Sequence, residues 1–192
     1  MFKLYYVPGL SSMAAHIALH EVGTPFEAVP LSPAKGENKT PDYLALNPEG
    51  KVPTLIVNGK PLTEVAAILY FLAKRFPQAH LLPMHDIECQ AQAISWMSFL
   101  ASSVHPARRF GEEQAARIWA IANGRLGRNE WAIDDYSVAD IHLFRLYWRY
   151  FNSKKPAPGT YPNLDAHYAR MMKRPAVIKT IEVESKVGYN FS

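Results

Sequence analysis

The first third of the chain alternates short apolar runs with stretches in which apolar residues recur every three or four positions. Alternation of this kind predicts strands and helices in turn. The predicted order is strand, helix, strand, short helix, two strands and a longer helix, at residues 2–7, 13–22, 26–31, 42–46, 54–57, 60–62 and 64–75. The helix between the first two strands predicts that they pair in parallel. Asn58-Gly59 between the last two strands is a strong hairpin signal, so that pair is predicted to be antiparallel.

The rest of the chain carries a helical pattern and no convincing strand. The pattern predicts helices at residues 87–110, 112–123, 137–151, 163–172 and 176–183. The segment 77–85, with two prolines, is predicted to be a linker. The expected organisation is an α/β domain over residues 1–76, the linker 77–85, and an all-helical domain over residues 86–192.

Composition and charge exclude several classes of protein. Of the 192 residues, 48% are hydrophobic and 20% charged, which excludes wholesale disorder. A single cysteine excludes an internal disulfide and fits a reducing compartment. The net charge of +4 is mild, and the basic pairs are scattered, so no nucleic-acid partner is expected. No run approaches the ~20 apolar residues that span a bilayer, so we expect a cytoplasmic protein without a membrane partner.

One pair of histidines has the spacing of metal ligands. His16 and His20 lie four positions apart on a predicted helix. No third ligand is evident nearby, and the His-Glu-x-x-His pattern of zinc proteases is absent. We therefore expect no metal site and interpret both as ordinary helix residues.

Three segments carry a family resemblance. They are Lys3–Ser12 leading into His16–Leu19, Asn47–Leu55 followed by Leu62–Glu64, and Tyr136–Ile141. In this order they resemble the cytosolic glutathione transferases, most closely the bacterial beta class, over nearly the whole chain. The resemblance implies a thioredoxin-like, glutathione-binding N-terminal domain followed by an all-α domain with the acceptor-substrate site. That architecture agrees with the one that the hydrophobic pattern predicts.

The resemblance points to Ser11 as the catalytic residue, at the position where the beta class has a cysteine. A thiol with a pKa near ~8.5 is mostly protonated at pH 7, and the thiolate is the nucleophile. A serine hydroxyl and a helix N-terminus both stabilise a thiolate, but serine forms no mixed disulfide. Ser11 and Ser12 are also good helix caps, so we expect one to cap the helix and the other to face the ligand. Tyr5 and Tyr6 are the alternatives.

The glutathione-binding residues that the resemblance implies come from two further places. Pro53 corresponds to the family's cis-proline, so that Val52 offers its backbone to glutathione like an added strand. Glu64 and Val65 begin a helix whose N-terminus would bind the γ-glutamyl carboxylate. The family usually has a serine where this chain has Val65, and that hydroxyl is lost.

A lysine is implied for the glycine carboxylate of glutathione. Lys35 lies in the loop where the beta class supplies that lysine, and Lys39 or Lys51 could serve instead. A solvated loop lysine is the competing interpretation of Lys35.

The helical domain supplies the second half of the implied site. His105 corresponds to a histidine that faces the glutathione sulfur in the beta class, where it would exchange protons near neutral pH. Pro106 interrupts the predicted helix just beyond it, and Ser103 replaces the family's glutamate. The acceptor pocket is expected to be lined by Tyr6, Leu10, Arg108 and Arg109.

The function implied is conjugation of glutathione, as co-substrate, to hydrophobic electrophiles in detoxification, by a homodimer and without a metal. Two alternatives stay open. One is glutathione-dependent peroxide or disulfide reduction. The other is a binding or interaction module that has lost activity, which the departures at Ser11, Val65 and Ser103 make credible.

Overall fold

The computed structural model describes residues 1–191, and its N-terminal part is a four-stranded sheet with three helices. These elements are β1 (Phe2–Tyr6), α1 (Ser12–Glu21), β2 (Phe26–Pro30), α2 (Pro41–Leu46), β3 (Thr54–Val57), β4 (Lys60–Thr63) and α3 (Val65–Arg75). The strand order is β2-β1-β3-β4. Strands β1 and β2 are parallel, whereas β1 with β3 and β3 with β4 are antiparallel. The predicted pairing directions are confirmed.

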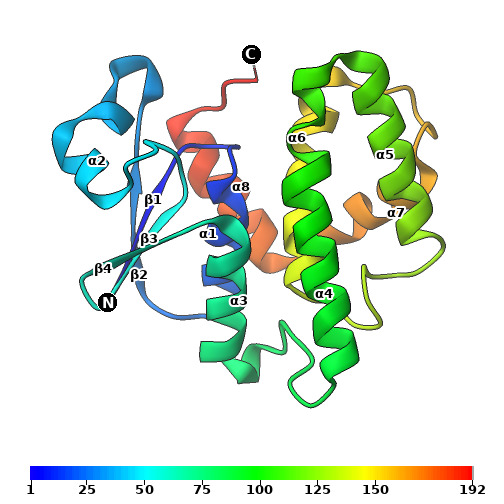
Figure 1. Cartoon of the computed structure of the whole chain (residues 1–192), viewed down its shortest axis with the longest axis horizontal. Helices are drawn as coiled ribbons and strands as arrows, with labels where there is room; N and C mark the ends of the chain where they lie inside the picture. The colour runs from blue at the N-terminus through cyan, green and yellow to red at the C-terminus, as the bar shows by residue number, and fades with distance from the viewer. Residues whose placement is uncertain (192) are drawn as a thin grey trace.

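Helix α1 is the centre of the first domain. Every residue from Ser12 to Leu19 is buried, because β1, α3, α6 and α8 all pack against this helix. A helix that is covered on all sides needs no polar face, which explains why α1 lacks the one-sided pattern of a surface helix. In Figure 1, α1 and α3 lie between the strands and the helical part of the molecule.

The second part of the chain consists of helices and the loops that join them, with no strand within the described residues. Its helices are α4 (Ile87–Phe99), α5 (Glu112–Leu126), α6 (Val138–Lys154), α7 (Pro162–Met171) and α8 (Pro175–Val187). A helix is present at each of the predicted places except over the second half of the first range, 87–110, and the last helix is longer than the predicted range 176–183. Helix α6 is buried from Val138 to Trp148 and is the central helix of this part.

The prediction of one helix over residues 87–110 is wrong. The α-helix ends at Phe99, and a π-helical turn at Leu100–Val104 and a 3-10 turn at Ala107–Phe110 follow. His105 N donates to Leu100 O at 2.9 Å, a bond five residues long instead of four. The cause is Pro106, which has no N–H to donate and whose ring crowds the preceding turn. The break redirects the chain so that Arg108 and Arg109 reach the site described below.

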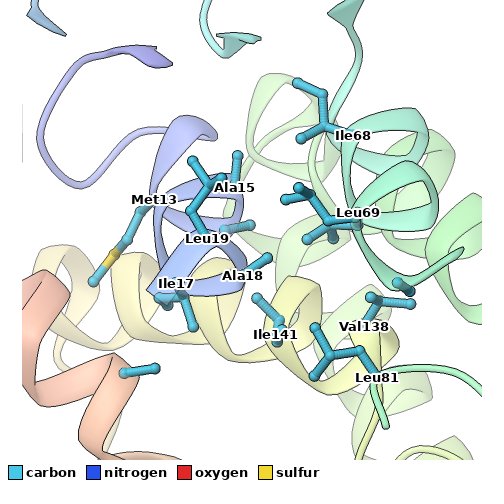
Figure 2. Packing of buried hydrophobic residues seen from close by; sticks show 14 of the residues in the cluster. Met13, Ala15, Ile17, Ala18, Leu19, Ile68, Leu69, Leu81, Val138 and Ile141 are labelled. Atoms are coloured by element: carbon cyan, nitrogen blue, oxygen red, sulfur yellow. The ribbon is translucent and has the colours of Figure 1, made fainter. Parts of the chain in front are cut away.

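The segment 77–85 is packed against the protein over part of its length. Leu81 and Leu82 are buried, and the Leu81 carbonyl accepts a hydrogen bond of 2.9 Å from Val138 N. Figure 2 shows side chains of α1 and α3 facing Val138 and Ile141 of α6, with Leu81 beside them. The two parts of the chain therefore share one apolar core.

The N-terminus of α6 is fixed by a buried carboxylate. Ser137 and Asp140 form a reciprocal capping box. Asp140 is fully buried, and its two oxygens accept hydrogen bonds from Ala132 N at 2.7 Å and Ser137 N at 2.9 Å. Asp140 Oδ1 also lies 3.0 Å from Nε2 of the buried His167 of α7. This cluster joins α6, α7 and the preceding loop.

Candidate functional site

A cavity of about 910 Å³ opens between the α/β part and the helical part. The first part contributes the loop before α1 and the loop before β3. The second part contributes the π-helical turn, the 3-10 turn, α5, α6 and the C-terminal segment. The volume lies within the range of ~300–1,000 Å³ that is typical of small-molecule sites.

Ser11 lies in the cavity wall, directly before the first residue of α1. Its Oγ donates a hydrogen bond of 2.7 Å to the carbonyl of Val52. The Ser12 hydroxyl is buried and bonds back to both the N–H and the carbonyl of Val7, at 3.1 Å each. Neither side chain caps α1, so the expectation that one serine is a cap is wrong. The loop offers Ser12 a backbone partner, and Ser11 faces the cavity.

The loop that carries Ser11 is anchored to helix α8 by Glu184. This carboxylate is fully buried; Oε2 accepts a hydrogen bond of 2.7 Å from Gly9 N, and Oε1 lies 2.9 Å from Nδ1 of the buried His16. Gly9 has φ +68°, and a Cβ there would come within 3.0 Å of the rings of Trp148 and Tyr189. Glycine is therefore required at this position.

His16 thus has a specific partner, which its interpretation as an ordinary helix residue missed. Helix α6 holds the same loop at the next residue, because Arg145 Nε donates to Leu10 O at 3.0 Å. The position of Ser11 depends on both α6 and α8.

The loop before β3 presents backbone groups to the cavity. The Val52–Pro53 peptide bond is cis, as predicted. Tyr43 OH and Asn47 Nδ2 both donate to the Lys51 carbonyl, at 2.6 and 2.8 Å, and so hold the loop in place. Val52 N donates to no group in residues 1–191, whereas Val52 O is engaged by Ser11. The Lys51 side chain is paired with Glu49 beside the cavity.

Several predicted site residues lie outside the cavity wall. Tyr6 is buried in the core with its ring 5.0 Å from that of His16, and it does not line the cavity where it was expected to border the acceptor. Lys35 is exposed on a 3-10 turn. Glu64 precedes α3 with φ +67° and does not begin it; the helix starts at Val65. Lys35, Glu64 and Pro53 are not part of the cavity wall.

The structure does bring together residues of both domains. The predicted residues that share the cavity wall are Leu10, Ser11, Lys51, Val52, His105, Arg108 and Arg109. The pattern-based reasoning missed the aromatic wall of Trp119, Tyr150 and Phe191, and it missed Arg145 and Arg149. Cations four positions apart in the apolar run of α6 are unusual, because arginine is rarely buried without a reason. That spacing was the available signal.

His105 is neutral in this environment. Burial first, and then the nearby Arg145, Arg108, Arg109 and Arg149, lower the pKa of His105 to about 4. An imidazole with that pKa holds no charge near pH 7. It can accept or donate a hydrogen bond there, but it is poorly matched to the proton exchange near neutral pH that the resemblance implied.

We expect acid to destabilise the fold through three histidines. Burial is the main cause that lowers the pKa of His20 and His105 to about 4 and of His142 to about 3. In the unfolded chain these groups take up protons near pH ~6.5. The unfolded state thus binds more protons below that pH, and the free energy of unfolding falls from about pH 6.5 towards pH 4. Urea unfolding at pH 7.5 and 5.5 measures the change, and His105→Gln reduces it; equal midpoints at both pH values would contradict the assignment.

The comparisons with known proteins cover almost the whole chain. Residues 1–74 match the model of the glutathione S-transferase N-terminal domain, and residues 96–175 match that of the C-terminal domain. The chain is 33% identical to glutathione S-transferase GstA of Escherichia coli O157:H7, over 95% of this chain and 98% of the relative. The chain belongs to the glutathione S-transferase family. The predicted family is confirmed, and as a member the protein is a transferase.

Solved structures of this family have the same architecture. The bacterial beta-class glutathione S-transferase of Sphingomonas chungbukensis superposes with a TM-score of 0.84 at 34% identity, covering 95% of this chain and 98% of that one. A sphingomonad glutathione S-transferase complexed with glutathione gives 0.84 at 32% identity, with the same coverage. These likenesses confirm the predicted fold class. Within residues 1–191 of this glutathione transferase, no helix is both long and apolar enough to cross a membrane.

Proposed function

We propose that this glutathione transferase binds glutathione against Ser11 and Val52 and transfers its thiolate to a hydrophobic electrophile in the same cavity. One observation carries the proposal. The Ser11 hydroxyl and the start of α1 border a cavity whose other wall holds Trp119, Tyr150 and Phe191. A thiol donor group and an apolar acceptor therefore fit side by side, as conjugation requires.

Thiolate formation is assigned to Ser11 and to the positive end of α1. The Ser11 hydroxyl has one proton, which it donates to Val52 O in this structure. A rotation about its χ1 redirects that proton to a sulfur in the cavity. The arginines of the helical wall add positive potential, which also favours the thiolate. His105, neutral on the same wall, is proposed to hydrogen-bond the thiol.

Backbone and terminal groups are assigned to the rest of glutathione. Val52 N, which has no partner in residues 1–191, pairs with the cysteinyl carbonyl, and Pro53 keeps this backbone in place. Helix α3 begins at Val65, directly after Glu64. The backbone N–H groups of its first turn bind the γ-glutamyl carboxylate. Lys51, in the cavity wall, receives the glycine carboxylate in preference to the exposed Lys35. Leu10, Arg108 and Arg109 border the acceptor.

The proposal extends to assembly and cellular role. Tyr70 of α3 and Ile87 and Ile94 of α4 are 39%, 70% and 49% exposed. Their helices lie next to each other (Figure 1). These exposed apolar side chains on neighbouring helices support the homodimer that the family resemblance implies. We assign the enzyme to detoxification in the cytoplasm, which its single cysteine, free of disulfides, supports.

Replacing Ser11 with alanine is expected to separate binding from activation. Glutathione is titrated into both proteins, with heat as the measure of binding and ultraviolet absorbance as the measure of thiolate. The wild type lowers the pKa of the bound thiol below ~8.5. Ser11→Ala binds glutathione with similar heat, but its bound thiol has a pKa about 1–2 pH units higher, because a hydrogen bond to a charged group contributes ~1.5–3 kcal/mol. Ser102→Ala, on the exposed π-helical turn, is the matched control.

Other outcomes have defined meanings. An equal thiol pKa in wild type and Ser11→Ala moves the activating role to His105 or the arginines. Turnover of a glutathione-linked disulfide without turnover of electrophiles would favour the reductase. No binding at all would reject the enzyme and favour the interaction module.

A further inference from the structure

The helical wall of the cavity is rich in cations and poor in carboxylates. Six cationic side chains line the cavity: Lys51, Arg108, Arg109, Arg145, Arg149 and Lys154. Glu112 is the one carboxylate in the described wall, and it is paired with Lys154 at 2.8 Å. The four arginines have no carboxylate partner within residues 1–191.

Arg145 is buried and Arg149 is half-buried, and the side-chain hydrogen bonds of both within residues 1–191 go to backbone carbonyls. Arg145 is 2% exposed, and its Nε donates to Leu10 O. Its two terminal nitrogens form no hydrogen bond within residues 1–191, although the residue lines the cavity. Arg149 Nη1 donates to Asn190 O at 3.0 Å, and its guanidinium lies over the Phe191 ring. Arg108 and Arg109 make no side-chain hydrogen bond in the described chain.

Arg145 is the member of this group whose charge is buried without a carboxylate bonded to it in residues 1–191. Burial, followed by Arg149 and Arg108, lowers the pKa of Arg145 to about 9. Glu184 raises the pKa of Arg145, but its carboxylate is already bound to Gly9 and His16. Charges buried without partners are costly unless a ligand supplies the partner.

We propose that the acceptor substrate of this enzyme is an anion: an aromatic or similarly apolar electrophile that carries a carboxylate or sulfonate. The inference rests on the proposed function, because it takes the cavity to be the acceptor site. The apolar body lies against Trp119, Tyr150 and Leu146, and the anionic group lies between Arg108, Arg145 and Arg149. A guanidinium pairs with such a group through two parallel hydrogen bonds.

The arginines are assigned to the acceptor and not to glutathione because of their position. All of them come from the helical domain, as do the aromatic residues of the wall. Ser11 and Val52, which are assigned to glutathione, come from the α/β domain. Trp119 and Tyr150, with ring centroids 4.9 Å apart, form an apolar surface on the arginine side.

The binding experiment compares dinitrobenzoate with its methyl ester, neither of which has a leaving group. By calorimetry in the presence of glutathione, the carboxylate is expected to bind about tenfold more tightly than the ester. The double variant Arg108→Gln/Arg149→Gln is expected to lose that preference and to keep its affinity for the ester. Arg117→Gln, on the exposed side of α5 and outside the cavity wall, is the matched control. Equal affinities for carboxylate and ester in the wild type overturn the inference.

The turnover experiment uses para-chloro-dinitrobenzoate and its methyl ester. The thiolate attacks the ring carbon that bears chlorine; the carbon–sulfur bond forms, chloride leaves with the bonding pair, and the thiol proton goes to solvent. For each compound, the enzymatic rate is divided by the rate of its uncatalysed reaction with glutathione. This division removes the difference in intrinsic ring reactivity between the carboxylate and the ester. The double variant is expected to lower kcat/KM about tenfold more for the carboxylate than for the ester. Any effect of the lost positive charge on the glutathione thiolate is shared by both compounds and cancels in this ratio.

The two experiments distinguish the failure of each proposal. Binding preference without turnover of either compound supports the anion site and rejects the transferase step. Equal loss for both compounds, with a raised KM for glutathione, assigns the arginines to glutathione and overturns the inference. Turnover of the ester with no advantage for the carboxylate overturns the inference and leaves the proposed function standing.

Discussion

Replacing Asp140 with alanine is expected to lower the free energy of unfolding by about 3–5 kcal/mol. Asp140 is fully buried and accepts hydrogen bonds from two backbone N–H groups, Ala132 and Ser137, while facing His167. Its removal leaves these polar groups buried and unpaired, and it removes the capping box of α6. Because α6 is the central helix, the loss affects the entire protein and not one helix end.

Urea unfolding followed by circular dichroism measures the effect of Asp140→Ala. Asp135→Ala, five positions earlier and exposed, is the matched control and is expected to stay within ~0.5 kcal/mol of the wild type. Asp140→Asn retains one acceptor oxygen and is expected to fall between the two. A loss below ~1 kcal/mol for Asp140→Ala would show that water or a local shift satisfies these groups.

Replacing Glu184 with alanine is expected to reduce stability and activity together. The carboxylate accepts from Gly9 N at 2.7 Å and lies 2.9 Å from His16 Nδ1, and both partners are inside the protein. Removing one member of such a buried pair costs about 3–5 kcal/mol. Gly9 lies two positions before Ser11, so the loop that places the hydroxyl loses its attachment to α8. Glu184 is a positioning residue in this account.

The two consequences of Glu184→Ala are measured separately. Urea unfolding gives the change in stability. At a temperature where the variant is fully folded, the pKa of bound glutathione is expected to rise towards ~8.5. Glu182→Ala, on the same helix but exposed, changes neither quantity. Glu184→Gln keeps one acceptor and restores part of the thiol shift. If Glu184→Ala is less stable but the thiol of bound glutathione keeps its wild-type pKa, Glu184 has a structural role only.

The sequence predicts most of the secondary structure because the local signals agree with the tertiary fold. Asn58-Gly59 gives the hairpin, and the capping box at Ser137 gives the start of α6. The helix break after Phe99 was missed because the apolar pattern continues through it. Pro106 predicts an interruption of the helix, but its effect reaches back over the whole preceding turn, which sequence spacing does not show.

The parts of the site that were missed depend on residues far apart in the chain. Glu184 and His16 are 168 positions apart, and their contact depends on the packing of α8 against α1. Arg145 and Arg149 come together with Arg108 because the chain turns at the π-helical segment. Conversely, Ser11 and Val52 were found because a resemblance located them. Tyr6 lies outside the cavity wall because it is on the buried face of β1, which the sequence pattern of this short strand does not specify.

The core that α1 shares with α3, α6 and α8 limits how this enzyme can be recombined with its relatives. The apolar cluster includes Ile17 and Leu69 from the α/β part together with Ile141, Phe144 and Val177 from the helical part. A chimera that joins the first 76 residues to another family member's helices would place mismatched side chains in this interior. A chimera that folds would have to take the packed surfaces of both parts from the same parent protein. The site, which is built from loops at the edge of that core, could then be varied on its own.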